Sequence, residues 1–455
     1  MDKNILKHHK YKKFYKNDTI YWGLGIENEV YLELENIKKM NKVFLLNNKR
    51  ERYSVDSSLN YKSEDLLKNY IFNLPEQVVE LPILLNSHSF TKTDCFNNPK
   101  TLYTKHTEPN PKFNGETLIE TLSKHNHFFK NSDYWEFDGD TIEFTTLNFF
   151  NTTLEDILDE LDFIKELFVD NLNNLFKKLN IFQNYGSVNI MKKNYPFASY
   201  LTNVNNVNTF NNGTLHYNIT LPTKLNKYGK IEDYPRFIKD HSKAIKIIQW
   251  VEPLLIAVYG SGDPFMTDIP SQRCAVCRYI GVGTYDSDLM RTGKILTCEI
   301  PEEEYYWYNL FDKYSKLNEI GMDINFNKHH NHGIEIRFLD HLDKELIKES
   351  FEFIVYLMDI VLINNRINYF GNPIKNKLWN NIVLQTMLKG KNYKLKNEEK
   401  RIYESIFKMK LKKQQINDIY YEILKKFKKQ KTNMFCFKQH YQFSNLVLNN
   451  PVKCF

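Results

Sequence analysis

The sequence predicts an α+β fold in which a mainly antiparallel sheet carries long helices on one face. Four short segments alternate apolar and polar residues with a period of two, which is typical of strands with one buried face. Three longer segments, 153–179, 234–258 and 344–368, carry apolar residues at helical spacing instead. The chain has 455 residues and 42% hydrophobic residues, enough for a large core.

The domain boundaries follow from this pattern. Residues 1–20 form a basic lead with Lys and His, and residues 21–395 hold the strands and the long helices. Residues 396–455 are Lys-rich and helical in pattern, as in LKKQQINDIYYEILKKFKKQK. The sequence therefore predicts one large domain over residues 21–395, which would hold any active site. It also predicts a helical extension over residues 396–455 that catalysis would not require.

The first strand pattern is GIENEVYLELE, residues 25–35, and it has one acidic face made by Glu27, Glu29, Glu33 and Glu35. Two carboxylates two residues apart, roughly 7 Å, repel by about 2 kcal/mol at an effective dielectric near 20. An acidic strand face is commonly just solvated, and this interpretation suits Glu33 and Glu35. Whether Glu27 and Glu29 are also solvated or belong to a functional site depends on the polar faces of the other strands.

The second pattern is a hairpin in WEFDGDTIEFTT, residues 135–146. Its Asp-Gly dipeptide predicts a two-residue turn, which places Glu136 opposite Thr141. Glu143 follows two residues later and therefore lies on the same face as Glu136. The alternative is a turn with incidental acids.

The last two strand patterns have chemically rich polar faces. GTLHYNITLP places His216 and Asn218 on one face, and GIEIRFLD places Glu335 and Arg337 on one face. Taken alone, His216 could be a hydrogen-bonded interior histidine, and Glu335 with Arg337 could be a structural ion pair.

Together the four polar faces predict a metal and phosphate site. If the strands share one sheet, its polar face collects eight residues: Glu27, Glu29, Glu136, Glu143, Glu335, His216, Asn218 and Arg337. Five converging carboxylates cannot all stay ionised without cations. Carboxylate oxygens suit Mg²⁺, and a neighbouring guanidinium suits a phosphate shared with the metal.

The order of these motifs resembles the glutamine synthetase and glutamate-cysteine ligase superfamily of carboxylate-amine ligases, particularly its amidoligase branch. The resemblance spans about Trp22 to Ile363 and includes GSGDPF, which follows a predicted helix. It implies a curved sheet that forms an active-site funnel, with ATP at one end and two or three Mg²⁺ ions, or Mn²⁺ as the alternative. A substrate carboxylate would attack the γ-phosphate of ATP, and an amine would convert the acyl phosphate to an amide.

The resemblance also implies roles for individual residues. Metal ligands would be Glu27, Glu29, Glu136, Glu143 and Glu335. Arg337 would clamp phosphate as a catalytic residue, and His216 and Asn218 would lie beside the nucleotide. Arg273 and Arg278 lie where relatives carry substrate or phosphate arginines, and both remain candidates. Relatives often have His-x-His where this chain has His216-Tyr217-Asn218. The implied partners are a small-molecule or peptide carboxylate, glutamate or a glutamyl group first, and an amine.

Two other functions compete with the ligase. The formal net charge of +7 permits a basic nucleic-acid-binding or particle-associated protein built on a degenerate ligase scaffold. A guanidino kinase-like phosphotransferase is the enzymatic alternative. Cys274 and Cys277 form one Cys-x-x-Cys pair, which fits buried thiols better than a zinc site that would need further ligands.

Composition indicates compartment and origin. The six cysteines follow no framework spacing and no signal peptide opens the chain, which predicts a cytoplasmic protein. The most apolar run, 353–363, is interrupted by Asp359 and is too short to span a bilayer. The abundance of Asn, Lys, Ile and Tyr is typical of AT-rich coding, as in giant DNA viruses, for which the host cytoplasm or the virion would be the location.

Overall fold

Among the described residues, the main sheet has six strands, and each pairing between them is antiparallel. The computed structural model describes residues 20–35, 118–130, 134–138, 141–146, 154–180, 186–191, 214–224, 226, 230–260, 285–292, 323–326, 333–363 and 371–430. The strand order is β3-β4-β1-β6-β10-β9. The bounds are β1 Ile20–Val30, β3 Trp135–Asp138, β4 Thr141–Thr145, β6 Thr214–Lys224, β9 Ile324–Phe326 and β10 Ile334–Asp340. The predicted α+β class with a mainly antiparallel sheet is confirmed.

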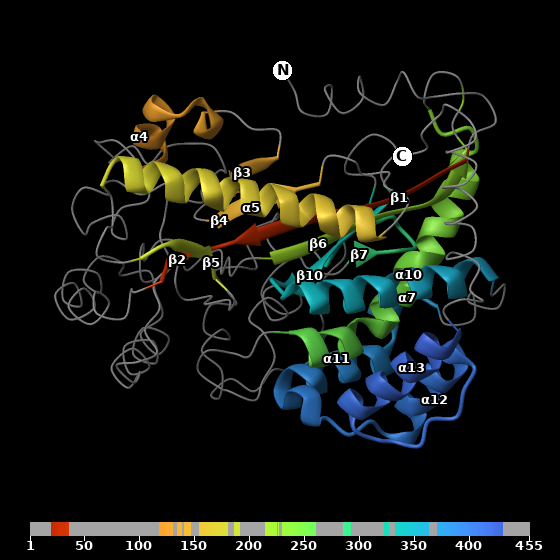
Figure 1. Ribbon diagram of the computed structural model, residues 1–455. Helices are drawn as coiled ribbons and strands as arrows, with labels where there is room; N and C mark the ends of the chain where they lie inside the picture. The colour runs from red at the N-terminus through yellow and green to blue at the C-terminus, as the bar shows by residue number, and fades with distance from the viewer. Residues whose placement is uncertain are drawn as a thin grey trace, which may run out of the picture.

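Long helices cover the apolar face of this sheet. They are α5 Leu154–Lys178, α7 Tyr234–Tyr259 and α10 Lys344–Ile363, and Figure 1 shows α5 and α10 lying across the strands. Tyr217 of β6 illustrates the contact, because its ring stacks on Phe351 of α10 with centroids 4.2 Å apart and its hydroxyl lies 2.6 Å from the hydroxyl of Ser350. The predicted helices are confirmed over their described residues, with ends within one or two residues for α5 and α7.

Helices at the C-terminal end belong to the same core. They are α11 Lys377–Lys389, α12 Asn397–Phe407 and α13 Ile416–Gln430, and Figure 1 shows them gathered beside α7 and α10. The rings of Tyr356 and Phe427 stack at 4.7 Å, and the hydroxyls of Tyr259 and Tyr420 are 2.6 Å apart. α13 thus turns an apolar face toward α7 and α10. That the chemistry does not require residues 396–455 stays a prediction.

The first strand ends earlier than its alternation predicts. Pairing in the main sheet ends at Val30, and β2 Leu32–Leu34 pairs instead with β5 Val188–Ile190 in a separate two-stranded sheet. Tyr31 lies between the two strands and is buried, and its carbonyl accepts a hydrogen bond from Met191 N at 2.9 Å. Glu33 and Glu35 therefore leave the acidic face, and Glu35 is exposed as expected.

The hairpin register is also different. Glu136 lies opposite Glu143, not Thr141, because strand pairing extends to Asp138 and Thr141. This register places Trp135 opposite Phe144 and buries both rings in the core. Glu136 and Glu143 still share one face, as predicted.

The remaining elements are short and connect these layers. They are α4 Leu118–His125, η1 His127–Phe129, β7 Tyr285–Asp286, β8 Arg291–Thr292, η7 Pro373–Lys375 and η8 Gly390–Asn392. None of the described helices is both long enough and apolar enough to span a membrane.

Two buried histidines make stability depend on pH. His241 Nε2 accepts a hydrogen bond from Leu221 N at 3.0 Å while Nδ1 lies 2.7 Å from the Phe237 carbonyl, so a second ring proton would face a donor. Burial lowers the pKa of His241 to about 4, and burial with the nearby Lys165 charge lowers the pKa of His341 to about 3.

We expect the free energy of unfolding to fall as the pH drops from 6.5 toward 4. Both histidines stay neutral in the folded chain while the unfolded chain takes up protons, which costs about 1.4 kcal/mol per histidine and pH unit. Urea titrations at several pH values measure this slope. The slope should be shallower in His241→Gln and unchanged in His125→Gln, which replaces an exposed histidine; equal slopes in both would contradict the assignment.

Candidate metal centre

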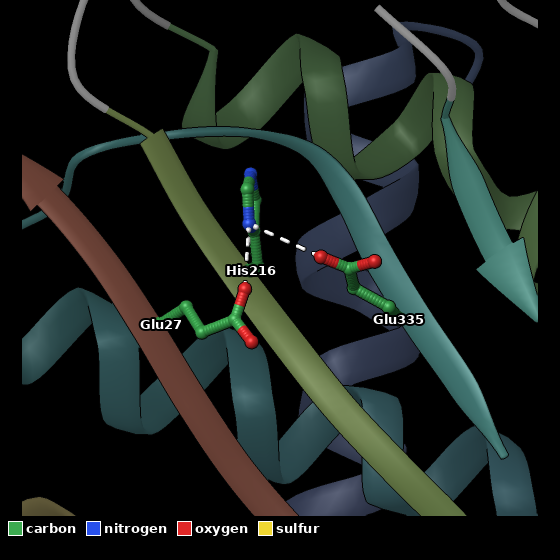
Figure 2. Close-up of side chains that lie close together, drawn as sticks. All are labelled: Glu27, His216 and Glu335. Atoms are coloured by element: carbon green, nitrogen blue, oxygen red, sulfur yellow. Dashed lines mark hydrogen bonds and ion pairs between the residues drawn. The ribbon is translucent and has the colours of Figure 1, made fainter. Parts of the chain in front are cut away.

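Three adjacent strands bring Glu27, His216 and Glu335 together. Glu27 of β1 lies directly opposite His216 of β6. Glu335 of β10 lies opposite Asn218, which is two residues after His216 on β6. His216 Nδ1 is 3.2 Å from Glu27 Oε2 and 3.4 Å from Glu335 Oε1. Figure 2 shows the two carboxylates approaching the same ring nitrogen from either side. One ligand atom from each residue lies within 4.8 Å of the others, a spacing that could hold a metal ion.

Burial makes this cluster demand positive charge. The exposed fractions are 5% for Glu27, 3% for Glu29, 3% for Glu335 and 2% for His216. Glu29 adds a third carboxylate, with Oε1 3.8 Å from His216 Nε2. Buried carboxylates are costly unless they are paired or coordinate a metal. The imidazole and Arg337 can offset only part of the negative charge, so the donor set fits a bound cation.

The kind of ion follows from the donors. Carboxylate oxygens favour Mg²⁺, Ca²⁺ and Mn²⁺, whereas imidazole favours later transition metals. One imidazole with two carboxylates therefore fits Mn²⁺ at least as well as Mg²⁺. Glu27, His216 and Glu335 would hold the ion, and Glu29 lies close enough to contribute.

Polar neighbours orient these three side chains. Thr214 Oγ1 lies 3.0 Å from His216 Nε2, which leaves Nδ1 turned toward Glu27 and Glu335. Asn325 of β9 donates to Glu335 Oε2 at 2.7 Å and leaves Oε1 facing His216. Such outer contacts fix the orientation of metal ligands. Neither Thr214 nor Asn325 was predicted from the sequence. Thr214 is two residues from His216 and therefore lies on the same face of its strand, so the period-two pattern could have identified it.

Arg337 and Asn218 both lie beside Glu335. Arg337 Nε is 3.6 Å from Glu335 Oε1, and its side chain is 20% exposed. Asn218 lies between Gly25 and Glu335 in the sheet and is 7% exposed. Its amide nitrogen has no hydrogen-bond partner among the described residues. Both side chains can therefore present donors to an anionic ligand beside the carboxylates.

The other predicted carboxylates form a row that runs away from His216. Glu29 lies opposite Glu143, and Glu143 lies opposite Glu136 at the edge strand β3. Glu143 is half-buried and accepts a hydrogen bond from Thr145 Oγ1 at 3.0 Å, whereas Glu136 is exposed. The structure thus places all five predicted carboxylates on one face. It brings Glu27 and Glu335 to Nδ1 of the imidazole and Glu29 to Nε2, whereas Glu143 and Glu136 lie further away along the row.

Several predicted residues lie outside the described part of the chain. They are Arg273, Arg278, Cys274 and Cys277, together with most of the GSGDPF stretch.

The helix side of β1 is anchored just behind the cluster. Asn28, between the two glutamates, donates from Nδ2 to the Thr214 carbonyl at 2.9 Å and accepts from Lys165 Nζ of α5. His341 Nδ1 lies 3.1 Å from the same amide. Burial lowers the pKa of Lys165 to about 8. This contact ties β1 to β6 at the level where Glu27 meets His216.

Comparison with known proteins gives one viral relative. No protein-family model matches the chain. The chain is similar to uncharacterized protein R704 of Acanthamoeba polyphaga mimivirus, with 40% identity over a match of 371 residues; the match covers 77% of this chain and 64% of that protein. The chain thus spans less than two thirds of that relative's length. A viral relative agrees with the origin that the composition indicates.

Proposed function

We propose that this chain is an ATP-dependent carboxylate-amine ligase that uses Mg²⁺ or Mn²⁺. The observation that carries the proposal is the buried Glu27, His216 and Glu335 group on three adjacent strands. The resemblance in motif order supplies the reaction class, and the mainly antiparallel sheet supports it to the extent that the resemblance implies such a sheet. We place the activity in the cytoplasm; for a viral protein, this would be the host cytoplasm or, alternatively, the virion.

The charges and hydrogen-bond donors of the site suggest a role for each residue in the proposed reaction. A bound ion would neutralise charge on the γ-phosphate of ATP, which is the main requirement of phosphoryl transfer. Arg337 lies beside Glu335 and would bind the transferring phosphoryl group through its planar fork. Asn218 would donate its amide hydrogens to a nucleotide or substrate oxygen. The further side of the sheet, toward Glu143 and Glu136, would widen into the funnel that admits the substrate carboxylate and the amine.

The first test is thermal unfolding with ATP, with Mn²⁺ or Mg²⁺, and with both. A ligand that binds only the folded state adds about 2.7 kcal/mol at 100 times its Kd, so a specific site raises the Tm by several degrees. We expect the largest shift with ATP and the metal together. A chain whose Tm responds to neither would not support a nucleotide-dependent enzyme.

Arg337→Lys should lower turnover by about 100-fold while changing the ATP dissociation constant much less. A point charge cannot reproduce a bidentate fork on a phosphoryl group that develops charge in the transition state. Steady-state kinetics and ATP calorimetry separate the two effects. Arg236→Lys is the matched control, because the Arg236 side chain is 78% exposed on α7. Unchanged turnover in Arg337→Lys would leave Arg337 as a structural partner of Glu335.

A further inference from the structure

Positive charge is concentrated in the C-terminal helices. Residues 371–430 contain 16 Lys and Arg but 5 Asp and Glu. The whole chain has 62 basic and 55 acidic residues, which leaves 46 basic and 50 acidic residues elsewhere. Coding bias toward Lys acts on the entire chain, whereas the residues outside 371–430 taken together carry more acidic than basic residues, so this bias does not explain the excess of positive charge here.

The basic residues gather along one side of α13. Its buried face consists of Ile416, Ile419, Tyr420, Ile423, Leu424 and Phe427. The opposite side presents Tyr421, Lys425 and Lys429 at spacings of four residues, all exposed. We name these three residues, together with the exposed Lys408, Lys412 and Lys413, the α13 basic surface.

The segment between α12 and α13 is fixed against the same side of α13. Glu422 accepts hydrogen bonds from the backbone nitrogens of Lys412 and Lys413, the shortest at 3.0 Å. Lys426 Nζ donates to the carbonyls of Phe407 and Lys408, at 2.7 and 3.1 Å. Lys408, Lys412 and Lys413 are therefore held beside the turns of α13 that carry Lys425 and Lys429.

Three of the five acidic residues of this region already accept hydrogen bonds within it. Glu399 is buried and accepts from Tyr393 and Asn381, and Glu404 accepts from the backbone nitrogen of Leu411. Glu422 holds the Lys412 and Lys413 backbone. Among the described residues, no carboxylate pairs with Lys412, Lys413, Lys425 or Lys429. The positive charge of the surface is thus available to a partner.

We propose that the α13 basic surface binds single-stranded nucleic acid. Lysines held in a row suit the phosphate backbone, and Tyr421, 46% exposed, offers a ring on which a base can stack. An anionic membrane fits less well, because the apolar face of α13 is buried in the core and cannot enter a bilayer. The surface is separate from the metal centre, so this binding does not depend on the ligase proposal.

The experiment measures fluorescence anisotropy of a labelled 20-nucleotide RNA with the full-length chain, without ATP or metal, over a series of salt concentrations. For the wild type, the logarithm of the affinity should fall linearly with the logarithm of the salt concentration. The triple variant Lys412→Gln, Lys425→Gln and Lys429→Gln should bind about 10- to 100-fold more weakly, and its salt slope should be shallower by about 2. Tyr421→Ala should lose about tenfold while keeping the wild-type slope.

The matched control removes the same charge elsewhere. Lys177, Lys178 and Lys239 are exposed on α5 and α7, and replacing all three by Gln should change RNA affinity less than threefold. Tm values of all variants confirm that they fold. An equal loss in the control triple would overturn the proposal, as would RNA affinity that does not respond to salt. Tighter binding to phosphatidylserine vesicles than to RNA would also overturn it, in favour of a membrane surface.

Discussion

Glu27→Gln and Glu335→Gln should each weaken Mn²⁺ or Mg²⁺ binding by at least about 100-fold, because loss of an outer contact alone commonly costs 10- to 100-fold. Both side chains face His216 Nδ1, at 3.2 and 3.4 Å. A glutamine amide keeps the shape of the carboxylate but removes the charge that an ion needs. Calorimetric titration of the metal-free protein measures the change.

The same substitutions should not destabilise the metal-free fold. Glu27, Glu29 and Glu335 are buried near one another, so removing one charge relieves repulsion. We expect an equal or higher Tm for both variants without metal, which separates loss of a ligand from loss of the fold. Glu35→Gln is the control, since Glu35 is exposed and contacts Ser187 instead. Glu136→Gln should have a smaller effect than Glu27→Gln, because Glu136 is exposed at the sheet edge. Wild-type metal affinity in Glu27→Gln and Glu335→Gln would remove these residues from the site.

Truncation after Lys396 should prevent the chain from folding. It removes α12 and α13, whose fully buried side chains include Tyr403, Ile416, Ile419, Tyr420 and Phe427. Loss of one such side chain commonly costs 2–5 kcal/mol, and roughly 5–15 kcal/mol is the whole stability of a domain. Circular dichroism and the recovery of soluble protein report the outcome.

Point variants refine this test. Tyr420→Ala should cost about 3–5 kcal/mol, whereas Tyr420→Phe loses the contact with the Tyr259 hydroxyl and should cost about 1 kcal/mol. The triple Lys412→Gln, Lys425→Gln and Lys429→Gln should keep the wild-type Tm, because these side chains are exposed. A truncated chain that folds with wild-type stability would show that residues 397–430 form a separable unit after all.

Periodicity predicted the helices and the sheet well because it reports burial on one face. It predicted α5 and α7 nearly to their ends. It failed at Tyr31, where the alternation continues into β2 but the strand leaves for another sheet. It predicted the helical segment that contains α13. It did not predict the burial of Ile416, Ile419, Tyr420, Ile423 and Phe427, although these residues have helical spacing.

The candidate site was partly predictable for the same reason. Strand parity placed Glu27, His216 and Glu335 on one polar face, and the observed register brings them together. The period-two pattern shows which face a residue lies on but not which strands are neighbours. It therefore could not show that Glu27 and Glu335 lie next to His216 while Glu136 lies at the sheet edge. Asn325 could not be found because β9 is three residues long and has no readable pattern.

The most direct measurement of the central claim is ATP turnover with hydroxylamine in place of the natural amine. An acyl phosphate reacts with hydroxylamine to give a coloured hydroxamate, whatever amine the enzyme uses. Purified protein would be supplied with ATP, Mg²⁺ or Mn²⁺, and in turn glutamate, aspartate, γ-glutamyl peptides and protein carboxylates. We expect ADP and hydroxamate to accumulate in equal amounts with one of these acids, and neither to form in Glu27→Gln. ATP-dependent phosphorylation of a guanidino compound without any hydroxamate would contradict the ligase and favour a kinase.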